Sequence, residues 1–439
     1  MSEPLSTPSK EDAPATSRRS FLKTSTAMVA GGALAASLAS RGVVHAAGDD
    51  TLKVALIGCG GRGSGAARNA VNADPNVKLT VLCDIFPDKV ELAKNTLSRA
   101  LGDKYAVTDD HCFSDFDGYK RVMETDVDVV LLCTPPHFRP EQLKAAVAAG
   151  KHIFCEKPIA VDAPGVRSVL ETTEEARKKG LSLVSGLCWR YDYGVRETMD
   201  RIKNGAIGDI ITAQENYLTS TLWHRGRKPE WSEMEYQIRN WLYFTWLSGD
   251  HIVEQFIHSL DKTMWLMNDE PPVRCFGLGG RQVRTGEEYG NAYDHFAVCY
   301  EWANGFKSFA YTRQMDGCMN DVEDYVQGSK GRARVLAHTI EGENPWQYPV
   351  EQKRKNPSMY DIEHIEMFAG IRSGNVLNNG VYMSYSTLLA IMGREACYTG
   401  QTITWEQAMN SQTKLGPDTY AWGDAPKSVV ATPGKTKFV

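Results

Sequence analysis

The stretch Lys53-Val-Ala-Leu-Ile-Gly58-Cys-Gly60-Gly-Arg-Gly63 decides the fold of the first half of this chain. An apolar run followed by three spaced glycines predicts a buried strand, a tight turn and the start of a helix. Gly58 would permit the turn, Gly60 would let the backbone approach a pyrophosphate, and Gly63 would let the helix pack closely on the strand. Because a helix N-terminus favours negative charge, the stretch predicts a dinucleotide site.

A second apolar run, residues 77–83, ends at Asp84 and strengthens this interpretation. The Asp84 carboxylate would accept hydrogen bonds from an adenosine ribose diol and would repel a 2′-phosphate, which favours NAD over NADP. Gly61 and Arg62, inside the turn, are predicted to contact the same cofactor. The alternative is a glycine turn with only a structural role, which the preceding strand and the following acid disfavour.

Strands and helices alternate over residues 51–188, which predicts an α/β domain with a doubly wound parallel sheet of the Rossmann type. After this point strands follow one another without helices between them, at residues 209–217, 274–279, 296–302, 307–312 and 333–337. We therefore expect a second, α+β domain over residues 189–410 with an open, mainly antiparallel sheet. Its late helices, at 359–373 and 382–398, could pack back on the first domain, and residues 411–439 would form a tail.

Composition excludes several classes of function. Of 439 residues, 42% are apolar and 23% charged, which is ordinary for a globular protein. The net charge of −5 offers no basic surface for nucleic acid. The ten cysteines contain no C-x-x-C pair and mostly lie within apolar runs, so we interpret them as small buried hydrophobic residues rather than as disulfides or zinc ligands.

The N-terminus resembles a twin-arginine export signal over residues 1–46. Ser17-Arg-Arg-Ser-Phe-Leu-Lys23 precedes a soft apolar stretch, residues 24–38, and Val44-His-Ala46 offers small residues for cleavage. We therefore expect a periplasmic protein without stable membrane insertion. Because this pathway exports folded proteins, the cofactor would be loaded before export, would stay bound, and would be re-oxidised in place.

Three further motifs resemble the glucose–fructose oxidoreductase, inositol dehydrogenase and rhizopine-catabolism (Gfo/Idh/MocA) family. They are Glu156-Lys157-Pro158, Asn204-Gly-Ala-Ile-Gly-Asp-Ile210, and Glu254-Gln-Phe-Ile-His258 followed by Asp261. The likeness covers about residues 51–400 and implies an NAD(P)-dependent oxidoreductase with a Rossmann domain and a C-terminal α/β domain. It also implies a homo-oligomer, a dimer or tetramer formed through the open sheet.

Lys157, Glu254 and His258 are the predicted catalytic residues. Lys157 follows a strand at the sheet edge where ligands collect, and a lysine there can lower the pKa of a substrate alcohol. His258, with an ordinary pKa of about 6.5, suits proton removal near neutral pH. Glu254 lies four residues earlier, on the same face of a helix, and could orient the imidazole or bind a substrate hydroxyl. A surface lysine and a core histidine are the alternatives, and the family usually has aspartate at the position of Glu254.

Other site residues follow from the same resemblance. It places Thr134, Pro135 and His137 beside the nicotinamide ribose, and Glu156 next to Lys157 at the cofactor. Arg190 and Tyr191 are predicted to line the cleft between the domains, although Arg190 could equally form a structural ion pair.

The long segment 217–246 holds four tryptophans, including Trp241, among basic residues. These aromatic faces could stack on a sugar in the substrate site, or the segment could be an arm that packs on a neighbouring subunit.

A metal site is a weaker possibility. His251, Glu254, His258 and Asp261 recur at helical spacing, as metal ligands can. No further ligand is identifiable elsewhere in the sequence, and hydride transfer does not require a metal. We therefore expect no metal.

The sequence favours an exported, NAD-dependent oxidoreductase that acts on a carbohydrate, a sugar derivative or a cyclitol. One alternative is an NAD-dependent, redox-neutral glycosidase, which oxidises a sugar transiently and then cleaves it by elimination and addition of water. Exported members of that kind tend to lack the lysine of Glu-Lys-Pro, which this chain retains at Lys157. A second alternative, a sugar- or cofactor-sensing protein without activity, is disfavoured because both Lys157 and His258 are present.

Overall fold

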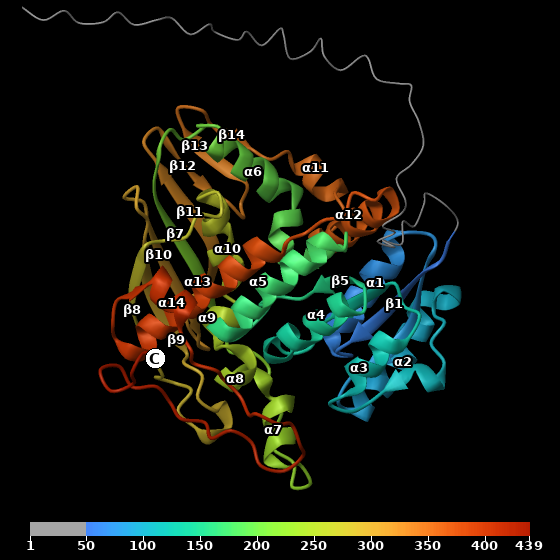
Figure 1. The fold of residues 1–439 in the computed structure, drawn as a ribbon. Coiled ribbons are helices and arrows are strands. Elements are labelled where there is room, and N and C mark those ends of the chain that lie inside the picture. The colour runs from blue at the N-terminus through green and yellow to red at the C-terminus, as the bar shows by residue number, and fades with distance from the viewer. Residues whose placement is uncertain (1–49) are drawn as a thin grey trace, which may run out of the picture. The chain divides into compact units, whose positions relative to one another are not determined.

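The computed structural model describes residues 50–439, and the predicted export signal, residues 1–46, lies outside the described residues. The first half of this part is built on a six-stranded parallel sheet, sheet A, in the order β3-β2-β1-β4-β5-β6 (Figure 1). Its strands are β1 (Leu52–Ile57), β2 (Val77–Cys83), β3 (Cys112–Phe113), β4 (Val129–Leu132), β5 (His152–Cys155) and β6 (Leu183–Ser185). The predicted doubly wound parallel sheet is confirmed.

Helices connect these strands as expected of a Rossmann fold. They are α1 (Gly61–Ala73), α2 (Pro87–Leu101), α3 (Gly118–Glu124), α4 (Arg139–Ala148) and α5 (Ala163–Lys178). Strands β1, β4 and β5 are almost entirely buried, which explains their continuous apolar sequences. From β1 the chain adds β2 and then β3 on one side, and after β3 it crosses back to place β4, β5 and β6 on the other side of β1. The strand order therefore reverses between β1 and β4. Ligands bind at this switch point in open α/β sheets.

The second half of the described chain is built on a nine-stranded mixed sheet, sheet B, in the order β14-β13-β12-β11-β7-β10-β9-β8-β15. Only β7 and β10 pair in parallel among the strands of this sheet, so the predicted mainly antiparallel sheet is confirmed. Its strands are β7 (Ile210–Thr219), β8 (Arg274–Gly280), β9 (His295–Glu301), β10 (Lys307–Gln314), β11 (Asp321–Gly328), β12 (Gly331–Arg334), β13 (Thr339–Gly342), β14 (Trp346–Gln347) and β15 (Ile403–Thr404).

Strand β11 was not predicted, because its sequence is rich in acidic residues that are rare in strands. The structure gives these side chains specific partners. Glu323 accepts hydrogen bonds from the backbone N–H groups of Leu336 (2.7 Å) and Ala337 (3.0 Å). Asp324 is buried and lies 3.0 Å from Lys262 Nζ. The partners come from elsewhere in the fold, so strand propensity alone could not identify this segment.

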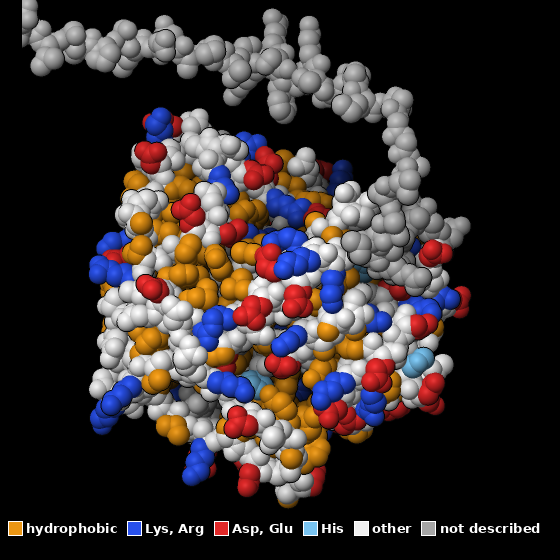
Figure 2. Space-filling view, in the orientation of Figure 1, with side chains coloured by type: hydrophobic (Ala, Val, Ile, Leu, Met, Phe, Trp, Pro, Cys, Tyr) orange, Lys and Arg blue, Asp and Glu red, His pale blue; other side chains and the backbone are white. Residues whose placement is uncertain are grey.

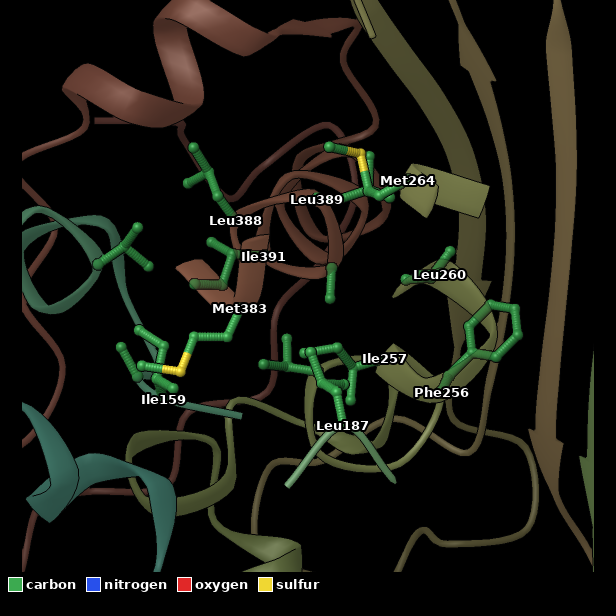
Figure 3. Packing of buried hydrophobic residues seen from close by; sticks show 14 of the residues in the cluster. Ile159, Leu187, Phe256, Ile257, Leu260, Met264, Met383, Leu388, Leu389 and Ile391 are labelled. Carbon is green, nitrogen blue, oxygen red and sulfur yellow. The ribbon is translucent and has the colours of Figure 1, made fainter. Parts of the chain in front are cut away.

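Helices cover the inner face of sheet B. The helices after sheet A are α6 (Tyr193–Lys203), α7 (Glu233–Arg239), α8 (Thr245–Ser248), α9 (His251–Glu254), α10 (Ile257–Leu266), α11 (Val350–Lys355), α12 (Met359–Ser373), α13 (Gly380–Thr399) and α14 (Trp405–Asn410). Short 3₁₀ segments lie at Gly102–Lys104, Asp109–His111, Pro136–Phe138, Cys188–Tyr191, Trp241–Tyr243 and Glu287–Tyr289. Figure 3 shows part of the core between α10 and α13, to which Ile257 and Leu260 of α10 and Leu389 of α13 contribute.

The two late helices contact elements from both halves of the chain. Helix α12 packs on α1, and the Asn69 side chain of α1 donates a 2.6 Å hydrogen bond to Asp361 of α12. Residues 377–379 pair with β6, since Leu183 N donates to the Leu377 carbonyl at 2.8 Å. The predicted domain boundaries, 51–188 and 189–410, stay a prediction.

Apolar side chains are exposed on the outer face of sheet B. Phe276 and Leu278 of β8 and Phe309 and Tyr311 of β10 share this face and are at least 36% exposed. An exposed apolar sheet face is a common surface for self-association. The homo-oligomer stays a prediction.

The surface and the cysteines agree with an ordinary globular protein. Basic and acidic side chains are interspersed over the face in Figure 2 rather than gathered by sign. All ten cysteines are free, and most are buried. Within residues 50–439, no helix combines the length and the apolar character needed to cross a bilayer.

Candidate functional site

A cleft of about 610 Å³ opens at the carboxyl edge of sheet A, at the switch point between β1 and β4. It brings together most of the predicted cofactor residues, namely Gly58, Gly60, Gly61, Arg62, Gly63, Asp84, Thr134, Pro135 and His137. Glu156 and Lys157 do not line this cleft. Phe86, Phe116 and Tyr420 line it as well, although no sequence motif includes them.

The glycine turn has the geometry that its sequence predicts. Gly58 has φ +99°, and a Cβ on it would lie 2.6 Å from the Cys133 carbonyl carbon. A Cβ on Gly63 would lie 1.9 Å from the Gly58 carbonyl oxygen, so only glycine lets α1 start this close to β1. Gly60 and Gly61 face open space instead.

The start of α1 is suited to a pyrophosphate. Its N-cap is Gly60, which has no side chain to cap the first-turn N–H groups. These donors and the helix dipole favour an anion. The cleft therefore fits the phosphates of a dinucleotide.

Asp84 is held in place at the end of β2. Its Oδ2 accepts a hydrogen bond from Cys59 N (2.8 Å) and its Oδ1 accepts one from Phe86 N (3.0 Å). Burial raises the pKa of this carboxyl. Each carboxylate oxygen keeps a second lone pair, so Asp84 can still accept hydrogen bonds from a ribose diol.

Lys157 and Glu254 lie in contact, although they are 97 residues apart in the sequence. Lys157 follows β5, and its Nζ donates a 2.5 Å hydrogen bond to the Glu254 carbonyl and lies 3.3 Å from Glu254 Oε1. Both side chains are 13% exposed. Glu254 Oε2 is buried and has no hydrogen-bond partner among residues 50–439. The Arg139 side chain donates a hydrogen bond to the Pro158 carbonyl and so stabilises the turn that follows Lys157.

His258 lies close to this pair, but not on one continuous helix with Glu254 as predicted. Helix α9 ends at Glu254 and α10 begins at Ile257, because Phe256 N bonds to the His251 carbonyl, five residues back, at 3.0 Å. Burial, together with the positive charges of Lys157 and Lys262, holds the pKa of His258 well below its usual value. His258 Nδ1 is buried and has no hydrogen-bond partner in the described part of the chain.

Lys262 fixes the backbone beneath His258. This lysine is 1% exposed, donates a 2.8 Å hydrogen bond to the His258 carbonyl, and pairs with Asp324 of β11. The backbone at His258 is therefore linked through Lys262 to sheet B.

Arg190 and Tyr191 make interactions within the protein. Arg190 Nε bonds to Asp261 Oδ2 at 3.0 Å, its Nη2 bonds to Asp269 Oδ1 at 2.5 Å, and its guanidinium lies 3.9 Å from the centre of the Tyr382 ring. The Tyr191 hydroxyl donates to Asn379 at 2.8 Å. These contacts favour the structural alternative for Arg190. The substrate-binding role of both residues stays a prediction.

Glu156 was predicted at the cofactor and Trp241 at the substrate, and the structure places them in different surroundings. Glu156 is buried and its Oε1 lies 3.0 Å from Arg62 Nε, so it secures the glycine turn rather than lining the cleft. Trp241 lines the cofactor cleft together with Trp223, Arg225 and Arg239. Its predicted contact with a sugar stays a prediction.

The histidine- and acid-rich segment does not form a metal site. Within residues 50–439, no group of three or more His, Cys, Asp or Glu side chains is arranged to hold a metal ion. His251 is buried, with its Nδ1 3.1 Å from the Tyr293 carbonyl. Asp261 is engaged by Arg190 and Ser386.

Comparison with known proteins identifies the family. Residues 52–185 match the family described as "Oxidoreductase family, NAD-binding Rossmann fold", and residues 199–378 match its "C-terminal alpha/beta domain". The chain belongs to the Gfo/Idh/MocA oxidoreductase family. The predicted family, the class of NAD(P)-dependent oxidoreductase and NAD as cofactor are thereby confirmed.

The similarity to named relatives and to solved structures extends over most of the chain. It is 28% identical over 359 residues to inositol 2-dehydrogenase of Salmonella typhimurium, covering 80% of this chain and 94% of the relative. It is 24% identical over 321 residues to glycosyl hydrolase family 109 protein 1 of Phocaeicola vulgatus, covering 72% of this chain and 64% of that protein. The crystal structure of scyllo-inositol dehydrogenase from Lactobacillus casei with bound NAD(H) and scyllo-inositol has the same fold, with a TM-score of 0.63, 18% identity and coverage of 81% and 100%.

We expect Asp84→Ala to weaken NAD binding about tenfold or more, because a hydrogen bond to a charged group contributes about 1.5–3 kcal/mol. The same change should relax discrimination against NADP, since it removes the charge that repels a 2′-phosphate. Titration of the purified variant with both cofactors measures the two effects, and Asp110→Ala, an exposed carboxylate outside the cleft, is the control. Unchanged affinity for both cofactors would show that Asp84 does not contact the ribose.

Proposed function

We propose that this protein oxidises a CH–OH group of a cyclitol, a sugar or a sugar derivative by hydride transfer to NAD. The observation that carries the proposal is the meeting of Lys157 Nζ with Glu254, beside two buried polar atoms, Glu254 Oε2 and His258 Nδ1, that lack partners among residues 50–439. Buried polar atoms normally find hydrogen-bond partners, and a polyhydroxylated substrate would supply them. The relatives named inositol 2-dehydrogenase support this substrate class.

The residues divide the chemistry between them. Lys157 donates a hydrogen bond to the substrate hydroxyl oxygen and lowers the pKa of that hydroxyl. His258 Nδ1 takes the hydroxyl proton while the C–H bond breaks. Glu254 holds the Lys157 ammonium in place and accepts a hydrogen bond from a neighbouring hydroxyl at Oε2. NAD, when bound, accepts the hydride, so that one CH–OH group becomes a carbonyl group.

Electrostatics favour His258 over Lys157 as the proton acceptor. The low pKa of His258 keeps the imidazole neutral near pH 7, and a neutral imidazole has a free nitrogen lone pair. Lys157 Nζ donates hydrogen bonds to two oxygens of Glu254, so it already acts as a hydrogen-bond donor at this place. A donor there can stabilise the developing alkoxide, which leaves His258 as the proton acceptor.

A redox-neutral glycosidase is the second candidate function. The likeness to a protein named glycosyl hydrolase family 109 protein 1 favours it, and the same residues could oxidise a sugar hydroxyl at the start of such a cycle. The two functions differ in net NADH, which accumulates only in a dehydrogenase reaction with a single substrate.

We expect Lys157→Ala and His258→Ala each to lower turnover by about 10²–10⁴-fold while NAD remains bound, because general acid–base groups contribute about this much. Absorbance of NADH is followed while a panel of cyclitols and sugars is added, and aglycone release is followed with aryl glycosides. Lys144→Ala and His111→Ala, which lie outside the cleft, are matched controls.

Near-normal rates in either variant would contradict the role given to that residue. Aglycone release without net NADH would instead identify the glycosidase. Sugar binding without either product would identify a sensing protein.

The pH dependence of turnover provides a separate test of His258. The ring is active when neutral, and its pKa lies below the usual value of about 6.5. As pH falls, kcat/KM should therefore stay constant through pH 6.5 and decline only at lower pH. A decline centred at or above pH 6.5 would contradict the neutral, buried imidazole as the base.

We further propose that the chain is exported through its twin-arginine signal. Arg18→Lys with Arg19→Lys should keep the precursor in the cytoplasm, because that pathway reads the arginine pair as an address. Cell fractionation and immunoblotting measure the distribution, and Arg41→Lys is the control. A periplasmic fraction equal to that of the unaltered chain would contradict this route.

A further inference from the structure

Residues 415–426, here called the C-terminal strap, contain no helix or strand and reach the cofactor cleft at Tyr420. The strap follows the last helix, and in Figure 1 it passes beside α7 and α8. Leu415 N donates a 2.8 Å hydrogen bond to Asp162, the N-cap of α5. At its other end, the Gly423 carbonyl accepts a 2.9 Å hydrogen bond from Met234 N of α7. The strap therefore connects the start of α5 with α7.

The inner side of the strap forms part of the wall of the cleft. Tyr420 lines the cleft, and its hydroxyl oxygen lies 2.7 Å from His137 Nε2. Its ring lies 5.8 Å from the ring of Phe116 and 5.4 Å from the ring of Phe138. Because these partners follow β3 and β4, Tyr420 spans the carboxyl ends of two strands of sheet A.

Trp422 extends this contact toward β2. Its ring centre lies 4.8 Å from that of Phe116 and 5.7 Å from that of Phe86. Both phenylalanines line the cofactor cleft, and Phe86 lies two residues after Asp84. The strap thus follows the cleft from the His137 side to the side where Asp84 would hold the ribose.

The backbone of the strap packs directly on side chains at the rim of the cleft. Gly416 has φ +93°, and a Cβ on it would lie 2.4 Å from His137 Cε1 and 3.1 Å from Trp246 Cε3. Trp246 Nε1 donates to Gln237 Oε1 at 2.7 Å, while Gln237 Nε2 donates to the Pro426 carbonyl at 3.1 Å. The strap is therefore fastened to the tryptophan-rich segment, whose Trp223 and Trp241 line the cleft as well.

The outer side of the strap faces solvent. Tyr420 is 39% exposed and Trp422 is 48% exposed, although both are large aromatic residues. Residues 411–439 contain no helix or strand, and the strap adds no strand to either sheet. Detachment of the strap would therefore open neither sheet.

We propose that the C-terminal strap belongs to the cofactor site and closes over the bound dinucleotide. Tyr420 and Trp422, packed on Phe116, Phe138 and Phe86, cover NAD along the carboxyl ends of β2, β3 and β4. NAD then leaves only after the strap has detached, so its release is slow compared with turnover. This inference rests on NAD as the cofactor and on the cleft at the carboxyl edge of sheet A as its site. It rests on no assumption about the substrate, so it can fail independently of the proposed reaction.

The test measures NAD release from the full-length protein. The protein is loaded with radiolabelled NAD, freed of excess cofactor and mixed with a large excess of unlabelled NAD, and the retained label is followed by rapid gel filtration. We expect Tyr420→Ala with Trp422→Ala to release NAD at least tenfold faster. Tyr193 is about as exposed as Tyr420 but does not line the cleft, so Tyr193→Ala is the control and should release NAD at the unaltered rate.

Milder variants keep the test readable if the double variant does not fold. Tyr420→Phe keeps the ring and removes the hydroxyl near His137, and Gly416→Ala displaces the strap by contact with His137 and Trp246. Either should accelerate release severalfold, with circular dichroism unchanged. Release at the unaltered rate in the folded variants would overturn the proposal, and so would slower release or tighter binding, which would mean that the strap obstructs NAD.

Discussion

The contact between Lys157 and Glu254 is the interaction on which the site depends. It joins the end of a strand in sheet A to the end of a helix that packs on sheet B, so two separately built halves meet at one ammonium group. Neither charge could remain buried alone, because an unpaired buried charge destabilises a fold by several kcal/mol. The pair leaves Glu254 Oε2 and His258 Nδ1 unpartnered in the described chain, which is the arrangement expected of a site that awaits a polar ligand.

The parts of the fold that could be predicted are those in which local sequence dictates local geometry. The glycine turn is an example, since Gly58 and Gly63 are the positions at which a side chain would collide with backbone. The buried strands of sheet A and the helix Met359–Ser373 are also readable from composition and periodicity. In each case the pattern that predicts the structure lies within one short stretch of the chain.

The rest depends on partners that are distant in sequence. Strand β11 carries Asp324, whose ion-pair partner Lys262 belongs to α10, far earlier in the chain. The break between α9 and α10 cannot be read from the spacing of Glu254 and His258, because a single wider turn causes it. Tyr420 and Trp422 had one detectable signal, the presence of aromatic residues in a polar tail, but only the fold shows that they reach Phe116 and His137.

Sheet B has a further property that follows from its two margins. It begins with β14 and finishes with β15, and each of these strands has only two residues. Very short border strands are one way in which natural sheets avoid uncontrolled growth. At one margin, β15 pairs only with Arg274 and Cys275 of the seven-residue strand β8. The apolar outer face differs from these margins, because a face-to-face contact closes after one partner and cannot grow.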